Sequence, residues 1–374
     1  MVKKIKVLQF PIGNTKGGIT RYVMTSWKFV DKEKFQFDFA TMSPFLDFEQ
    51  EIVAEGGIVH YIHEYAEINP VRFKAEFKEI LLNGEYDIVH LHTGRWKSTL
   101  AEDACKEAGI RKIIIHAHST GVVSEDKNER ENNMLRHQEI VKRLKIDDNV
   151  ECWACSKAAA NFLFGNRMKD DKIHIMPNAI DLERYSYKDD IRKNVRNEMG
   201  WEDKYVIGHI GRFAYPKNQE FLLEIILQLK EFIPNIKLVL VGDGVNLEKC
   251  KKYVSKHGLD EFVLFTGYRT DAEQLLQGFD AFCLPSEYEG VSLALIEAQA
   301  AGLRCYASDC MPKDVGITKS VKFLPLDKKN WCECILSDYK LKLQRADNIE
   351  TIRNAGYDIR EQIKKVEKGY MGEY

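Results

Sequence analysis

Short apolar runs alternate with longer amphipathic stretches along the whole chain. The short runs are rich in Ile, Val, Leu and Phe and have the length of buried strands, whereas in the longer stretches apolar residues recur every three or four positions, as on one face of a helix. In the first half the predicted strands are residues 5–10, 37–41, 58–62, 87–92, 112–118, 151–156 and 172–177. Residues 19–30 and 71–82 are predicted helices between them.

The second half repeats this plan. Its predicted strands are residues 206–211, 237–242, 262–267, 281–285, 304–307 and 321–325, and its predicted helices are residues 218–232, 247–257, 272–278 and 293–301. Strands that alternate with helices form parallel sheets covered on both faces. The pattern therefore predicts an α/β protein with two doubly wound domains in tandem, joined around the polar stretch 181–203. Two such domains that face each other share a ligand crevice at the carboxyl ends of their strands.

The composition sets limits on location and partners. A chain of 374 residues is longer than a single core usually supports, in agreement with two domains. The net charge of -2 does not fit a nucleic-acid-binding protein. No apolar run reaches the roughly 18 residues of a membrane span, and the first ten residues read as a strand and not as an export signal. We therefore expect a cytoplasmic protein with no nucleic-acid partner.

Nine cysteines are scattered along the chain without a disulfide framework, which also fits a reducing compartment. Cys152 and Cys155 form a C-x-x-C motif, and Cys332 and Cys334 form a C-x-C motif, but no second pair with zinc spacing accompanies either. These cysteines are therefore better explained as small buried apolar residues than as metal or redox sites.

The segment 285–302 carries the clearest chemical signal. It places Glu289 in a turn of small residues and Glu297 about two helical turns later, around a helix start that offers unpaired N–H groups to an anion. Two acids beside an anion site suggest recognition of a sugar attached to a phosphate. The alternative is an ordinary junction between sheet and helix, with one surface Glu and one half-buried Glu.

Two cations stand at the end of the first strand of the second half. Arg212 follows this strand directly, and Lys217 lies five residues later, just before the next helix. Both are expected to face the same space as the Glu289 loop, where each contact to a phosphate contributes about 1.5–3 kcal/mol when desolvated. The alternative is a solvated pair of surface cations.

Four histidines end two neighbouring strands of the first half. His90 and His92 end one strand, and strand alternation places His116 and His118 on one face of the next. A His at a strand tip can bond sugar hydroxyls or a developing charge. A core histidine with satisfied hydrogen bonds is the better explanation for His90 and His116, and a metal site is the weaker alternative because no Asp or Glu shares this spacing.

Three glycine-containing turns complete the candidate residues. After the first strand, Gly17 and Gly18 allow the backbone to approach a ligand closely, although the loop matches no dinucleotide or P-loop motif. The strand before Gly242 ends in a G-x-G turn, and the strand that ends at Gly267 continues into Tyr268 and Arg269, whose planar groups could contact a nucleobase.

Together these motifs resemble glycosyltransferase family 4, the retaining GT-B enzymes, and in particular its branch for exopolysaccharide and capsular polysaccharide synthesis. The resemblance covers nearly the whole chain. It rests on the loop of two glycines, H-A-H-S-T at 116–120, A-C-S-K at 154–157, P-N-A-I-D at 177–181, G-R-F at 211–213 with K-N at 217–218, V-G-D-G at 241–244 and the E-x7-E segment at 289–302. Position 292 departs from the pattern, because Ser stands where the family more often has Gly or Pro.

The resemblance implies a GT-B fold of two Rossmann-like domains that face a central cleft. Residues 1–185 would form the acceptor-binding domain, with the last helix, 356–374, packing back on it, and residues 186–355 would form the donor-binding domain. The donor would be a nucleotide-sugar, with UDP-sugar preferred, and the acceptor a saccharide or lipid-linked saccharide. No cofactor or metal would be required, since two cations and a helix start can stabilise the leaving diphosphate.

The site residues that the resemblance implies fall into three groups. The catalytic residues are His118, Glu289, Arg212 and Lys217. The donor-binding residues are Gly17, Gly18, Arg212, Lys217, Gly242, Gly267, Tyr268, Arg269, Glu289, Gly290, Val291, Ser292, Leu293 and Glu297. Candidates on the acceptor side are Lys16, Arg21, His92 and Ser119. Glu297 would hold the ribose hydroxyls, and Glu289 the transferred sugar. Retention by front-face attack is favoured, because the sequence offers no convincing protein nucleophile.

Other functions remain open. A dehydrogenase is disfavoured because its glycine fingerprint is missing after the first strand. A nucleotide-sugar epimerase of GT-B fold and a non-catalytic nucleotide-sugar binding protein share the same donor site. The basic segment that begins at Arg136 and ends at Lys145 could rest on an anionic membrane at the inner face of the cell, or could be a plain surface helix.

Overall fold

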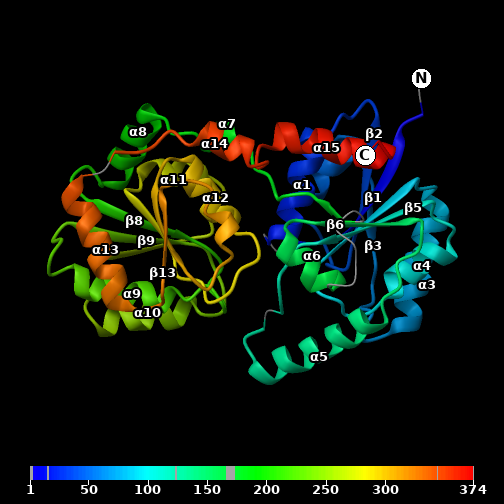
Figure 1. The fold of residues 1–374 in the computed structure, drawn as a ribbon, viewed down its shortest axis with the longest axis horizontal. Coiled ribbons are helices and arrows are strands. Elements are labelled where there is room, and N and C mark those ends of the chain that lie inside the picture. Colours follow the sequence, from blue (N-terminus) through cyan, green and yellow to red (C-terminus); the bar gives the residue numbers. More distant parts are fainter. Residues whose placement is uncertain (1–2, 15–16, 123, 166–172, 343, 374) are drawn as a thin grey trace. The chain divides into compact units, whose positions relative to one another are not determined.

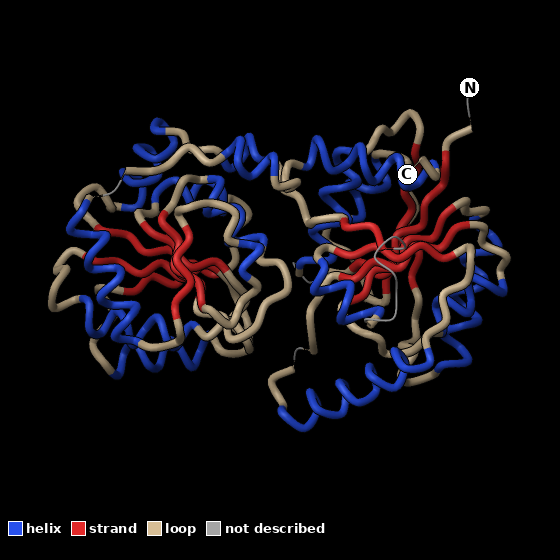
Figure 2. Tube along the Cα trace, in the orientation of Figure 1, coloured by secondary structure: helices blue, strands red, loops and turns tan. Residues whose placement is uncertain are grey.

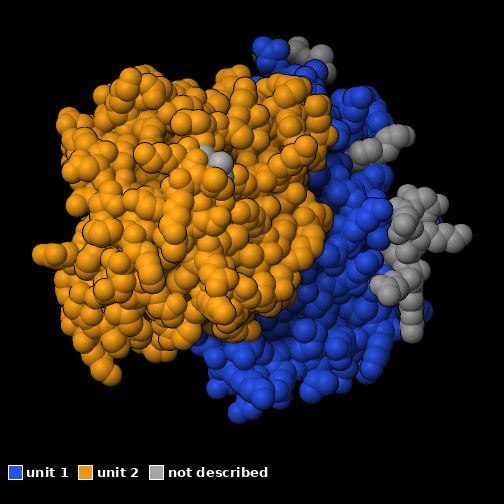
Figure 3. Space-filling model, turned by 60° about the vertical axis from the view of Figure 1, so that its left-hand side comes forward, with its two compact units in different colours: residues 1–179, 359–374 blue, residues 180–358 orange. Residues whose placement is uncertain are grey.

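The computed structural model describes residues 3–14, 17–122, 124–165, 173–342 and 344–373. The chain divides into two compact units, coloured separately in Figure 3. Unit 1 consists of Met1–Ala179 and Ile359–Tyr374, and unit 2 of Ile180–Asp358. The last segment of the chain thus belongs to unit 1.

Unit 1 is built on a seven-stranded parallel sheet with the order β3-β2-β1-β4-β5-β6-β7 (Figures 1 and 2). Its strands are β1 (Ile5–Ile12), β2 (Phe35–Thr41), β3 (Val59–Tyr61), β4 (Ile88–Thr93), β5 (Lys112–Ala117), β6 (Val150–Ala154) and β7 (Ile173–Ile175). Its helices are α1 (Gly18–Phe29), α2 (Glu49–Ala54), α3 (Pro70–Gly84), α4 (Leu100–Glu107), α5 (Lys127–Arg143), α6 (Lys157–Phe164) and α15 (Ile359–Met371).

Unit 2 has a six-stranded parallel sheet with the order β10-β9-β8-β11-β12-β13. Its strands are β8 (Tyr205–Ile210), β9 (Ile236–Val241), β10 (Val263–Gly267), β11 (Ala281–Leu284), β12 (Arg304–Ser308) and β13 (Val321–Leu324). Its helices are α7 (Leu182–Tyr185), α8 (Asp189–Met199), α9 (Gln219–Leu229), α10 (Leu247–Lys256), α11 (Ala272–Gly278), α12 (Leu293–Ala300), α13 (Lys328–Leu341) and α14 (Ile349–Asn354), with a 3-10 turn, η2 (Lys313–Val315).

Helix α3 forms where an apolar stripe coincides with helix-start chemistry. In α3, Phe73, Phe77 and Leu81 recur every four residues and are buried, so one face of the helix packs against the unit. Asn69 caps this helix by accepting a hydrogen bond of 3.1 Å from the N–H of Arg72, and Pro70 occupies its first turn. The central strands β4, β5 and β11, by contrast, are buried along almost their whole length, as parallel strands covered by helices on both faces must be.

The strand order locates the functional edge of each sheet. In unit 1, successive strands are added to the sheet in one direction from β1 and in the opposite direction from β4. In unit 2 the same reversal lies between β8 and β11. In doubly wound sheets, the crevice at such a reversal, outside the carboxyl ends of the strands, binds the ligand. The predicted doubly wound architecture is therefore confirmed within each unit, and each unit has one such reversal. Among the described residues, no helix is both long enough and apolar enough to span a bilayer.

Candidate active site

The reversal point of unit 2 joins the two loops that carry the strongest sequence signals. Lys217 lies between β8 and α9, and Glu289 lies between β11 and α12. Because β8 and β11 are neighbours in the sheet, the Lys217 ammonium pairs with a carboxylate oxygen of Glu289. The Ser286 hydroxyl donates to the same oxygen over 3.0 Å, and the N–H of Glu287 donates to the carbonyl of Pro216 over 2.9 Å. The two loops thus form one connected edge.

Arg212 follows β8 at the same edge and is exposed. Its main-chain carbonyl accepts a hydrogen bond of 2.9 Å from the side-chain amide of Gln219, which also lies 3.2 Å from Nε2 of His209. The backbone is therefore fixed, while the described residues provide no ion pair for the guanidinium. A fixed strand end with an uncompensated cation is suited to an anionic ligand.

Close packing explains the glycines of this edge. Gly242 has φ 142°, and a Cβ at this position would lie 2.1 Å from the carbonyl oxygen of Gly211. Only glycine therefore allows the turn after β9 to approach the loop after β8 this closely. Gly267, at the end of β10, has φ 67°, and a Cβ at this position would contact nothing within 4 Å. Glycine is therefore favoured there by the backbone conformation and not by close packing.

The start of α12 carries the remaining predicted donor residues. Ser292 is the N-cap and is 3% exposed, Leu293 begins the helix, and Gly290 and Val291 are half-buried in the preceding turn. Glu297 is fully buried in α12, whereas the side chain of Glu289 is 13% exposed. The two acids therefore lie in different environments. A difference of this kind is needed if they have separate roles.

Two planar side chains follow β10. Tyr268 is 47% exposed, and a side chain that stacks on a base must be accessible. Arg269 instead makes a two-pronged ion pair with Asp271, with nitrogen–oxygen distances of 2.8 and 2.6 Å. Arg269 is thus held by its own loop.

The predicted residues of unit 1 that the structure describes lie at or just after the ends of β1, β4 and β5. Gly17 is the N-cap of α1, and a Cβ on Gly18 would contact nothing within 4 Å, so packing within the protein does not require a glycine there. Arg21 lies in the first turn of α1, and the Ser119 hydroxyl donates to the carbonyl of Gly121 over 3.0 Å after β5. Lys16 lies outside the described residues.

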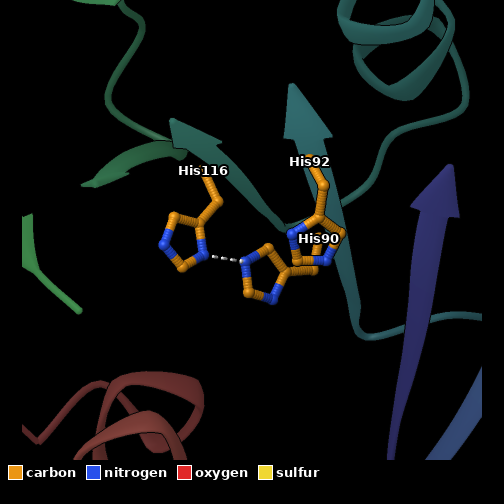
Figure 4. Close-up of side chains that lie close together, drawn as sticks. All are labelled: His90, His92 and His116. Carbon is orange, nitrogen blue, oxygen red and sulfur yellow. Dashed lines mark hydrogen bonds between the residues drawn. The ribbon is translucent and has the colours of Figure 1, made fainter. Parts of the chain in front are cut away.

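The four histidines lie on one face of β4 and β5, and His90, His92 and His116 are drawn in Figure 4. His90 and His116 form one hydrogen-bonded pair, with 3.1 Å between Nε2 and Nδ1, and His92 and His118 form a second pair, with 3.0 Å between Nδ1 and Nε2. His90, His92 and His116 are buried, and His118 is partly exposed at the strand end. Burial lowers the pKa of each ring, that of His118 to about 3, so all four are neutral at neutral pH.

The side-chain nitrogens of His90, His92 and His116 all lie within 4.8 Å of one another, close enough to hold a metal ion. The geometry of the His90–His116 pair fits a hydrogen bond better. Its ring planes differ by 6° and its ring centres are 5.3 Å apart, about as far as a nitrogen contact of 3.1 Å allows. The lone pair of one ring therefore points at the other nitrogen, whereas two metal ligands would direct their lone pairs at a common third point.

Unit 1 also contains a pocket that the sequence did not reveal. It has a volume of about 380 Å³ and lies at the ends of β1, β4 and β5. Phe10, Phe73 and Trp96 contribute aromatic walls, and His92, Ser119, Arg95 and Glu102 are among its polar lining residues. A mixture of aromatic surface and a few polar groups is typical of small-molecule sites.

Glu102 and Arg95 carry the charges of this pocket. Glu102 lies in the first turn of α4 and is 9% exposed, and its Oε2 is buried without a hydrogen-bond partner. Burial raises the pKa of Glu102 to about 7. Arg95 is half-buried and makes no ion pair with a described residue, and burial lowers its pKa. Neither residue stood in a recognisable motif, so only the fold could identify them.

Two family models together match most of this chain. Residues 16–184 match the family description Glycosyltransferase Family 4, and residues 191–320 match Glycosyl transferases group 1. The chain is 30% identical over 368 residues to EpsF of Bacillus subtilis (strain 168), which is assigned as a glycosyltransferase, covering 96% of this chain and 94% of EpsF. It is 27% identical over 300 residues to the capsular polysaccharide biosynthesis glycosyltransferase CapH of Staphylococcus aureus, covering 79% and 78% of the two chains.

Among solved structures, HepE of Anabaena in complex with UDP-glucose has the same fold. It superposes with a TM-score of 0.76 at 16% identity, covering 98% of this chain and all of HepE. This likeness shows the fold, which is GT-B as the sequence predicted.

Proposed function

Because the chain belongs to the glycosyltransferases with a family 4 and a group 1 domain, we propose that it transfers a sugar, with retention of configuration, from a UDP-sugar to a saccharide or lipid-linked saccharide during surface polysaccharide synthesis. The observation that carries this proposal is the connected edge of unit 2, where Arg212, the Lys217–Glu289 pair and the start of α12 meet. The UDP-glucose complex of HepE and the capsule function of CapH support the choice of donor and pathway.

The donor assignment follows from charge. The diphosphate is doubly negative, and Arg212, Lys217 and the first N–H groups of α12 supply positive charge and hydrogen-bond donors. We assign Glu289, which pairs with Lys217, to accept hydrogen bonds from the hydroxyls of the transferred sugar, and Glu297 to accept from the ribose. Tyr268 offers its exposed ring to the base. Gly17 and Gly18 of unit 1 are assigned to the diphosphate and His118 to the transferred sugar.

The acceptor assignment rests on the pocket of unit 1. Its aromatic walls fit the apolar face of a sugar ring, and Glu102 can hydrogen-bond a hydroxyl because its carboxyl has an oxygen without a partner. Arg95 fits an anionic group such as the phosphate of a lipid-linked saccharide. Arg21 and Ser119 are assigned to the same side of the reaction.

The reaction requires little covalent chemistry from the protein. The bond between C1 of the sugar and the phosphate oxygen breaks, and the acceptor oxygen attacks C1 from the same face. The acceptor proton passes to the departing phosphate oxygen. Arg212, Lys217 and the amides of α12 stabilise the charge that develops on the leaving UDP, so that we assign no metal or other cofactor to this step.

A donor screen followed by turnover tests the proposal. Thermal shift over UDP- and GDP-sugars should identify one UDP-sugar, because a ligand at 100 times its Kd adds about 2.7 kcal/mol. With this donor, UDP release should require an added saccharide acceptor. Conversion of the donor alone into another nucleotide-sugar would instead indicate an epimerase, and binding without turnover over a broad acceptor panel a binding protein.

Contact with a membrane is a separate proposal, and it rests on the basic residues of segment 136–145. Arg136, Lys142, Arg143 and Lys145 are exposed, whereas Ile140, Val141 and Leu144 are half-buried. Charge alone would therefore hold this segment at the inner face of the membrane, and salt should release it. Cosedimentation with anionic liposomes at low salt tests this. If Lys142→Glu and Arg143→Glu leave cosedimentation unchanged, the segment has no such role.

A further inference from the structure

One continuous chain of hydrogen bonds joins the four histidines through two other buried side chains. His118 contacts His92, whose Nε2 lies 2.8 Å from Oε1 of Gln9 on β1. The Gln9 amide nitrogen lies 3.1 Å from the Tyr370 hydroxyl on α15, and this hydroxyl lies 2.8 Å from Nδ1 of His90. His90 then contacts His116. The order is therefore His118, His92, Gln9, Tyr370, His90, His116.

Each link of this chain can be satisfied in only two ways. A neutral imidazole has one donor and one acceptor nitrogen, a hydroxyl can donate one proton, and an amide has distinct donor and acceptor ends. The four rings are neutral because burial lowers their pKa values. Once the direction of the bond at Gln9 is fixed, the bonds of His92 and His118 must point the same way. The Tyr370 hydroxyl continues this direction to His90 and His116 when it donates to His90, but it can also accept from both of its neighbours.

The Gln9 amide fixes this direction for the half of the row that ends at His118. Its oxygen can only accept and lies 2.8 Å from Nε2 of His92, so this ring nitrogen carries the proton, whereas the amide nitrogen donates to the Tyr370 hydroxyl over 3.1 Å. Nδ1 of His92 therefore accepts from Nε2 of His118, 3.0 Å away. At the two ends of the row, Nε2 of His116 and Nδ1 of His118 are buried without a hydrogen-bond partner among the described residues.

We propose that Gln9 is a positioning residue for His118, because its amide holds the hydrogen-bond row in one direction and so fixes His118 with its proton on Nε2 and a lone pair on Nδ1. Gln9 is 2% exposed on β1 and acts only through His92. The assignment rests on the proposed function, in which His118 contacts the transferred sugar. His118 then contributes a fixed ring orientation and a hydrogen-bond acceptor, and no positive charge.

Two substitutions at position 9 separate this role from simple packing. Gln9→Met keeps the volume and removes both polar ends, so His92 and His118 lose their fixed direction. Gln9→Glu keeps an acceptor toward His92 in either protonation state, so the proton of His118 stays on Nε2. When ionised, this carboxylate also accepts from Tyr370, whose oxygen then accepts from His90, so the proton of His90 moves to Nδ1 while that of His118 does not move.

The test is long-range 1H–15N correlation spectroscopy of the full chain labelled at its histidines, with the signals of His118 identified from the spectrum of His118→Gln. We expect the Nε2–H form for His118 in the wild type and in Gln9→Glu, and a mixture of both forms in Gln9→Met. With the UDP-sugar donor, kcat should fall about ten-fold in Gln9→Met and change less than about two-fold in Gln9→Glu, with KM for the donor little altered in both.

Several results would overturn the assignment. An Nδ1–H ring or a positively charged ring for His118 in the wild type contradicts the direction of the row. If the His118 signals of Gln9→Met match those of the wild type, Gln9 does not position His118. The same conclusion follows if both variants lose kcat equally at equal thermal stability. If no transferase activity is found at all, the proposed function fails while the spectra still test the row.

Discussion

The substitution Glu102→Gln should stabilise the protein at alkaline pH and weaken its use of the acceptor. Glu102 is 9% exposed, and burial raises its pKa from 4.5 to about 7. The folded state therefore keeps a proton between pH 4.5 and 7 that the unfolded state releases. Stability falls as pH rises through this window and stays at the lower level above it. The pKa difference corresponds to about 3 kcal/mol, which glutamine, having no charge, avoids.

Thermal unfolding at pH 8 and pH 4 measures this effect. Glu102→Gln should unfold about 6–10 °C above the wild type at pH 8 and show little difference at pH 4. Glu107 on the same helix provides a control of opposite sign, because its ion pairs with Lys74 and Lys78 lower its pKa. Glu107→Gln should therefore lose stability at pH 8. The same gain for Glu102→Gln at both pH values would show that the gain does not come from the carboxylate charge, and no gain at pH 8 would show that the carboxyl is solvated. In turnover, Glu102→Gln should raise KM for the acceptor and leave UDP binding unchanged.

Three further predictions concern the donor site. Arg212→Ala and Lys217→Ala should each weaken UDP binding by about 1.5 kcal/mol in calorimetric titration, whereas Lys193→Ala, which removes an exposed ion pair with Asp189, should not; unchanged affinity in both site variants would refute the assignment. Glu297→Gln should weaken binding of both UDP and the UDP-sugar, whereas Glu289→Gln should leave UDP binding unchanged and lower kcat. Equal losses of affinity for both ligands in both variants would mean that the acids only hold the loop in shape. Activity should survive excess EDTA. If EDTA abolishes activity and magnesium or manganese restores it, the reaction depends on a metal. If zinc restores it, the cluster of His90, His92 and His116 is the first metal site to test.

The elements that the sequence predicted best are those whose signal is local. Buried parallel strands are continuous apolar runs, so β8, β9 and β11 lie within a residue or two of their predicted positions. Helix α5 was recognised only over its second half, from Arg136, because its remaining part is polar and has little apolar periodicity. Its start at Lys127 depends on the Asp126 side chain, which accepts from the N–H of Glu129 over 2.7 Å. Such a cap is visible in a sequence only when a periodic stretch follows it.

The site shows the same limit. Lys217 and Glu289 could be associated from the sequence because both follow strands, and the strand order then brings them into contact. Gln9 and Tyr370 are 361 residues apart, and no pattern predicts that the last helix places a hydroxyl against the first strand. The polar Gln9 between buried apolar residues of β1 was the one available signal. Glu102 lies in a helix with the half-buried Asp103 and the exposed Glu107, so its burial follows only from tertiary packing.

The measurement that tests the central claim most directly is acceptor-dependent release of UDP by the full chain. It uses the UDP-sugar that stabilises the protein most, and it compares the wild type with Lys217→Ala and Lys193→Ala. The proposed function predicts that release requires both the donor and a saccharide acceptor, and that the product keeps the anomeric configuration of the donor. It also predicts that Lys217→Ala lowers kcat/KM about ten-fold or more while Lys193→Ala does not. Release that is independent of acceptor, an inverted product, or full activity of Lys217→Ala would contradict it.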